Sequence, residues 1–106
     1  NGWAFNLTNQ KGEAVGVEWG TPGISSPGLE NYVPLPPEQM QALLKGASPE
    51  LVACDTSQRG WTEVRLTSEA ATAQWRFVSS VVEPAFTTQS GPELTAEEGH
   101  RRLRFA

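Results

Sequence analysis

Residues 71–78, Ala-Thr-Ala-Gln-Trp-Arg-Phe-Val, decide the fold class of this chain. Up to Phe77 the apolar side chains occupy odd positions and the polar ones even positions, a period of two that is typical of a half-buried β-strand. A second segment, residues 62–66, alternates in the same way, and Ser68-Glu69 between the two suits a tight reversal. The two segments therefore predict an antiparallel hairpin.

A second hairpin is predicted near the start of the chain. Residues 3–7 alternate between apolar and polar, a turn-forming stretch occupies residues 9–12, and the alternation resumes over residues 15–19. We expect the odd-numbered apolar side chains of both segments to share one face that points at a core. These side chains are Trp3, Phe5, Leu7, Val15, Val17 and Trp19.

The segment between the hairpins predicts an ordered loop followed by one short helix. Residues 20–37 are crowded with glycine and proline, which prevent a regular helix. Pro36-Pro37 and the spacing of the following apolar residues predict a helix over about residues 37–45. We expect the loop to bury the apolar side chains that it carries, which are Ile24, Leu29, Tyr32, Val33 and Leu35.

The last twenty residues are more polar than the rest. We divide the chain into residues 1–86, which carry the hairpins, and residues 87–106, which we expect to form an extended polar arm or an edge strand. Leu103 and Phe105 are the side chains that would add such a strand. The predicted fold class is mainly β with one short helix.

Composition excludes several classes of function. Twelve acidic and eight basic residues give a net charge of −4, so the chain as a whole repels the phosphates of nucleic acids. The single cysteine, Cys54, allows neither an internal disulfide nor a multi-cysteine zinc site. No stretch is long and apolar enough to predict a membrane span.

The sequence contains few residues in patterns that support catalysis. His100 is the only histidine, and Glu97 and Glu98 are the only candidate metal ligands close to it. No Gly-x-Ser-x-Gly stretch presents a nucleophile. We therefore predict no catalytic residue and no metal ligand within this chain.

The four tryptophans leave one alternative function open. Three of them fall on predicted apolar faces, whereas Trp61 alternates with the charged residues Glu63 and Arg65. Exposed aromatic rings form platforms for sugars or for other proteins. The alternative is thus a free-standing β-rich module that binds glycan or protein through Trp61 and a neighbouring aromatic ring.

Three stretches in a fixed order resemble the C-terminal part of the alkaline phosphatase D family. Order and spacing agree over residues 1 to about 82, but Trp19 and Trp61 stand where the family more often has Phe and Tyr, and the segment beyond Phe86 has no match. The stretches are Asn1-Gly2-Trp3-Ala4, residues 16–28 (Gly-Val-Glu-Trp-Gly-Thr-Pro-Gly-Ile-Ser-Ser-Pro-Gly), and Arg59-Gly60-Trp61 together with residues 73–78.

This resemblance implies a parent enzyme of the calcineurin-like metallophosphoesterase type, which hydrolyses phosphate esters with iron and calcium ions. In the family, the first stretch directly follows a Gly-Asp-x-His metal-binding motif. The resemblance therefore places the metal ligands upstream of Asn1 and puts Asn1, Gly2 and Trp3 at the edge of the substrate pocket, although packing in a sheet accounts for Trp3 equally well. It also implies that the two hairpins complete one sheet of the enzyme's sandwich.

Further expectations follow from the resemblance and from the first residues. The chain opens without a methionine and with alternation already under way at Trp3, so we expect it to be a piece of a longer polypeptide, inactive alone, whose upstream part is its natural partner. Family members are typically exported by bacteria. An isolated sheet would leave an apolar face bare, and we expect self-association through that face; its side chains are Phe5, Val17, Trp19, Trp75 and Phe77.

Overall fold

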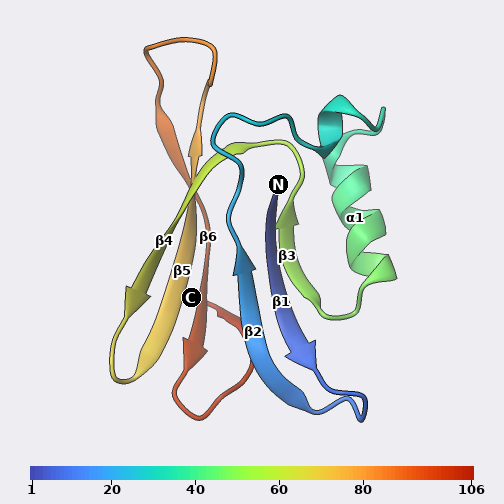
Figure 1. Ribbon diagram of the computed structural model, residues 1–106, viewed down its shortest axis with the longest axis vertical. Coiled ribbons are helices and arrows are strands. Elements are labelled where there is room, and N and C mark those ends of the chain that lie inside the picture. The colour runs from blue at the N-terminus through green and yellow to red at the C-terminus, as the bar shows by residue number, and fades with distance from the viewer.

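The computed structural model describes residues 1–106 and shows a mainly β chain with a single α-helix, which confirms the predicted fold class at this level (Figure 1). A short 3-10 turn, Leu29–Asn31, lies in the long loop before the helix. The elements, in chain order, are β1 (Gly2–Thr8), β2 (Ala14–Gly20), α1 (Pro37–Ala47), β3 (Leu51–Asp55), β4 (Arg59–Leu66), β5 (Ala70–Val78), β6 (Thr88–Glu97) and β7 (Arg104–Phe105).

The strands form two antiparallel sheets. The first has the order β2-β1-β3 and the second the order β4-β5-β6-β7. Both predicted hairpins are present, as β1-β2 and as β4-β5, but they belong to different sheets. The expectation that the hairpins complete a single sheet is therefore wrong.

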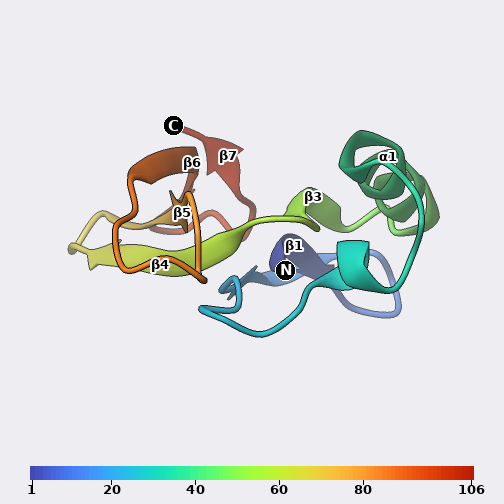
Figure 2. The same cartoon turned by 90° about the horizontal axis from the view of Figure 1, so that it is seen from above.

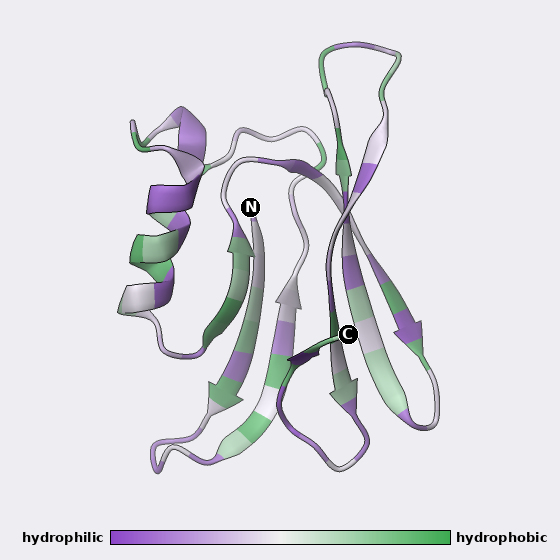
Figure 3. Ribbon diagram, turned by 180° about the vertical axis from the view of Figure 1, so that it is seen from behind, coloured by the Kyte–Doolittle hydropathy of each residue, from purple (hydrophilic) through white to green (hydrophobic).

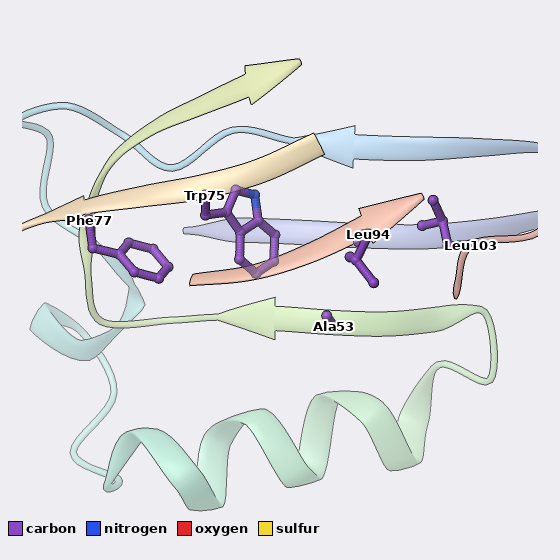
Figure 4. Close-up of a cluster of buried hydrophobic side chains, with 6 residues drawn as sticks. Ala53, Trp75, Phe77, Leu94 and Leu103 are labelled. Carbon is purple, nitrogen blue, oxygen red and sulfur yellow. The ribbon is translucent and has the colours of Figure 1, made fainter. Parts of the chain in front are cut away.

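The two sheets lie next to each other, with α1 on the far side of the first sheet, beside β3 (Figures 1 and 2). One core cluster joins them (Figure 4). Ala4 and Ala53 come from the first sheet, and the larger side chains come from the second sheet and from the segment that follows β6. These larger side chains are Trp75, Phe77, Leu94 and Leu103.

The predicted shared face of the first hairpin is wrong, and a β-bulge explains why. Thr8 lies opposite Ala14, but Leu7 lies opposite Gly16, so Val15 is an extra residue in β2. A shift of one residue moves side chains to the other face of a sheet. Beyond the bulge, Ala4 lies opposite Trp19, and this pair faces the second sheet.

Strand β3 is an element that the sequence analysis did not predict. Its first four residues, Leu-Val-Ala-Cys, are all apolar and show no alternation, and Figure 3 shows the strand in green along most of its length. A continuous apolar run of this length does not identify a strand by period. It pairs with β1, so that β1 becomes the central strand of its sheet.

The segment after Phe86 is not an extended arm, whereas the edge strand predicted near Phe105 is present as β7. Residues 88–97 form β6, which pairs with β5 on one side and with β7 on the other. Leu94 is only 2% exposed, and the backbone N–H of Leu103 donates a 2.7 Å hydrogen bond to Oδ1 of Asn6 in β1. Leu94 and Leu103, with Ala96 packed against the same core, tie this otherwise polar segment to the rest of the chain.

The loop and the helix bury less than the sequence predicts. Ile24 and Tyr32 are 67% and 73% exposed, and Leu35 is exposed as well. The helix extends to Ala47, two residues beyond the predicted end, and none of its side chains is buried. No helix of the structure has the length and the apolar character that a membrane span requires.

The apolar face that we expected to be bare is largely covered. Trp75 and Phe77 are 3% and 4% exposed, because the first sheet lies against them. Val17 and Trp19 are half-buried against the same core. Phe5 lies on the opposite face of β1, stacked on Trp3 with ring centroids 6.5 Å apart.

Candidate functional site

The densest group of polar contacts surrounds Arg59, the first residue of β4. Its Nη2 lies 2.5 Å from Oε1 of Glu30 and 3.1 Å from Oδ1 of Asn31. Its Nε and Nη1 donate to the backbone oxygens of Ser26 and Ser57 at 2.5 and 3.0 Å. Because the guanidinium is occupied by protein acceptors and its side chain is 13% exposed, Arg59 fastens the long loop to β4.

Asn1, the residue before β1, reaches the same place. Its Oδ1 accepts a 3.1 Å hydrogen bond from the backbone N–H of Leu29. A Cβ atom added to Gly28 would lie against the end of the Glu30 side chain, 2.9 Å from Nη1 of Arg59 and 3.0 Å from Nδ2 of Asn1, so these side chains meet beside Gly28. We call this group, Asn1, Ser26, Gly28, Glu30 and Arg59, the Arg59 junction.

Two polar atoms of the Arg59 junction are buried without a hydrogen-bond partner. They are Nδ2 of Asn1 and Oε2 of Glu30. Most buried polar side-chain atoms in proteins are hydrogen-bonded, so an unpaired donor and an unpaired acceptor at one place are unusual. Sequence reasoning identified Asn1, but nothing in the sequence around Glu30 indicates its role.

Gly2 and Trp3, the other two predicted pocket residues, are used in packing. Gly2 is buried, and a Cβ atom there would lie 2.9 Å from the indole ring of Trp75. Trp3 is half-buried and lies across from Gly20 and Cys54, on the face of β1 opposite to Ala4. Of the three residues, the structure brings only Asn1 to the Arg59 junction.

The segments that carry the resemblance contact one another around the Arg59 junction. The N–H of Gly60 donates a 3.1 Å hydrogen bond to the oxygen of Gly23, and Nε1 of Trp75 donates a 3.2 Å hydrogen bond to the oxygen of Gly20. A Cβ atom on Gly60 would lie 2.9 Å from Cα of Phe77. Together with Gly2 under the ring of Trp75, these contacts join all three stretches.

The Arg59 junction does not fit a metal ion. Glu30 is its only carboxylate, and the guanidinium of Arg59 already neutralises that charge at 2.5 Å. A cation placed there would lie against another cation, while iron and calcium need several anionic or oxygen ligands. No group of three or more His, Cys, Asp and Glu side chains in the structure is arranged to hold a metal ion.

His100 and Glu97, two of the candidate metal ligands, contact other protein groups. Nδ1 of His100 lies 3.1 Å from the backbone oxygen of Glu98, and the ring is exposed. Glu97 pairs with Arg104, whose Nη2 is 2.6 Å from Oε1. A hollow of about 410 Å³ adjoins these side chains, but no three of the carboxylate and imidazole groups around it are placed to hold a metal ion.

No aromatic platform forms at Trp61. The two aromatic pairs in the chain are Trp3 with Phe5 and Trp75 with Phe77, and Trp61 is half-buried outside both. The outer face of the second sheet carries a shallow hollow of about 350 Å³ with mostly polar and charged walls. No observation therefore favours the glycan-binding or protein-binding alternative.

Comparison of the chain with protein-family models, with curated proteins and with solved structures gave no match.

Proposed function

We propose that this chain forms the C-terminal part of a metal-dependent phosphatase of the alkaline phosphatase D type and serves as a scaffold beside the active site. The observation that carries the proposal is the contact among the three resembling stretches. The three stretches are separate in the sequence but pack on one another in the fold, as the hydrogen bonds from Gly60 to Gly23 and from Trp75 to Gly20 illustrate. In this proposal, residues upstream supply the metal ligands and hydrolyse the phosphate ester.

The chain exposes more surface and is less compact than a monomer of its size usually is, which supports the proposal that it packs against another part of a larger enzyme. Its accessible surface is 6753 Å², against about 5,800 Å² for a compact monomer of this mass. Its radius of gyration is 14.8 Å, whereas about 13 Å is usual for this length. Only 14 of 106 residues are buried, and large apolar side chains such as Ile24, Leu66 and Val82 are exposed, so the chain has apolar surface to offer to a neighbouring part of the same enzyme.

Within this proposal, the two sheets belong to a calcineurin-like sandwich, and the enzyme is exported and holds iron and calcium ions. Asn1 is the residue of this chain nearest to the chemistry. Its buried Nδ2 is a hydrogen-bond donor without a partner, and a substrate oxygen or an upstream residue would satisfy it. Arg59 contributes by fixing the loop that positions Asn1.

The test is to join the chain to its natural upstream sequence and to assay chromogenic phosphate monoesters and diesters with added calcium and iron. We expect turnover that chelation removes and that the metals restore, whereas the chain alone is expected to be inactive. Absence of turnover in the longer polypeptide under all these conditions would reject the proposal.

A matched pair of variants tests the scaffold role. In the longer polypeptide, Arg59→Ala is expected to reduce the active fraction and the melting temperature together, because Glu30 and three backbone or side-chain oxygens lose their donor. Arg102→Ala removes the same charge at an exposed position and is expected to change neither. Equal effects of the two substitutions would contradict a specific role for Arg59.

A further inference from the structure

Strand β4 is one edge of the second sheet, and its outer side is open beyond Gly60. In Figure 1 it lies at the outside of the molecule, with β5 as its only neighbouring strand. The N–H of Gly60 points away from β5 and binds the loop at Gly23. The free part of the edge therefore consists of residues 62–66.

The free backbone groups of this edge belong to the even-numbered residues. Thr67 donates to the oxygen of Ala70 in β5, and Gly60 donates away from β5. Inward and outward groups alternate along an antiparallel strand, so the N–H and C=O groups of Thr62, Val64 and Leu66 point outward. No hydrogen bond outside the strand ladders uses these groups.

The side chains on this edge are complementary to those of a second copy of the same strand. In an antiparallel pair of two β4 strands centred on Val64, Thr62 lies opposite Leu66 of the second copy and Glu63 lies opposite Arg65. Val64 meets its own counterpart, and the three outward-facing pairs would exchange about six hydrogen bonds. Opposite charges directly across from each other stabilise such a pair, and a central pair of β-branched side chains does so too.

Two aliphatic side chains on this edge are exposed to solvent and would be covered by a second strand. Val64 and Leu66 are 53% and 74% exposed although they lie on the core side of the sheet, the same side as Trp75. Arg76 binds Oε2 of Glu63 at 2.8 Å, and Oε1 has no hydrogen-bond partner. A long open edge that carries exposed aliphatic side chains is a template for strand addition.

We propose that β4 is a self-association edge, through which two copies of this chain pair antiparallel about Val64 into one continuous sheet. The match of the free hydrogen-bonding groups, the apolar centre and the Glu63–Arg65 charges in a single register selects a second copy as the partner. The inference is independent of the proposed enzymatic role. The contact is small, so the dissociation constant is expected to be on the order of 0.1 mM.

A pair of charge variants tests this register. Arg65→Glu and Glu63→Arg each place like charges opposite each other, and each variant alone is expected to associate about tenfold more weakly in sedimentation velocity. An equimolar mixture of the two variants restores opposite charges across the pair and is expected to regain the affinity. Arg102→Glu, which makes the same change of charge at an exposed position, is expected to have no effect.

Two further measurements keep the proposal falsifiable if a charge variant folds poorly. Val64→Pro removes an outward N–H, which an edge strand tolerates, and is expected to abolish pairing while the circular dichroism spectrum is unchanged. The amides of Thr62, Val64 and Leu66 are expected to exchange with deuterium faster on dilution. A chain that stays monomeric at about 1 mM, or one whose association survives both Arg65→Glu and Val64→Pro, would overturn the proposal.

Discussion

At the scale of single residues, Gly60 is the position where the structure leaves no room for a side chain. A Cβ atom there would overlap the carbonyl oxygen of Arg76 and lie 2.9 Å from Cα of Phe77. Gly60→Ala is expected to lower the free energy of unfolding by about 3 kcal/mol, because backbone atoms must move. Gly16→Ala, at a strand position with nothing within 4 Å, is expected to change it by less than about 0.5 kcal/mol in the same urea titration. Equal losses for the two variants would contradict the crowding at Gly60.

Cys54, also at the residue scale, has a thiol that is held in its neutral form. Burial raises the pKa of this thiol, the charge of Lys45 lowers it, and the charge of Asp55 raises it, with a net increase above the ordinary value. Alkylation is therefore expected to be slower than for an exposed cysteine. Because the unfolded chain ionises first as the pH rises, stability is expected to fall between the ordinary pKa and the raised one.

Lys45 provides the variant for this test. Lys45→Gln removes the charge that lowers the pKa of Cys54, so alkylation by iodoacetamide at pH 8 is expected to slow further. Lys11→Gln, in the turn after β1, is the control and is expected to have no effect. Faster alkylation in Lys45→Gln at an unchanged melting temperature would contradict this account.

At the scale of elements, β6 is an integral strand of the second sheet. Leu94→Ala is expected to destabilise the chain by about 3 kcal/mol, because Leu94 is 2% exposed in the core that joins the sheets. Leu43→Ala makes the same chemical change in α1 at a side chain that is 60% exposed and is expected to cost less than about 1 kcal/mol. Urea unfolding measures both. A loss at Leu94 no larger than at Leu43 would mean that β6 is only loosely attached.

The elements also show how far the sequence could predict this structure. Strict alternation identified β1, β2, β4 and β5, because successive side chains of a strand point to opposite faces of its sheet. The bulge at Val15 and the all-apolar strand β3 leave no signal in the alternation, and β6 is polar except at a few buried positions. At the candidate site, Asn1 was found through resemblance, whereas its hydrogen bond with the backbone of Leu29, next to the Glu30–Arg59 ion pair, depends on the path of a loop that only tertiary structure determines.

At the scale of the whole molecule, one core serves both sheets, so neither is expected to be stable without the other. Trp75 is the main link, since its ring covers Gly2 and its Nε1 donates to the oxygen of Gly20. Trp75→Phe removes this donor and part of the ring, and is expected to lower the free energy of unfolding by about 2 kcal/mol. Trp61→Phe, on a half-buried ring, is the matched control and is expected to cost less.

Amide hydrogen exchange in the Trp75→Phe variant tests whether the chain unfolds as one unit, because it shows which strands lose protection. If the core is shared, native-state hydrogen exchange should show β1 and β5 amides losing the same protection in Trp75→Phe, because both open only in global unfolding. If the sheets were independent, β5 alone would lose protection and β1 would keep its own. The contact between Leu103 and Asn6, which joins residues 97 positions apart, favours the shared outcome, since the segment after β6 cannot leave without exposing β1.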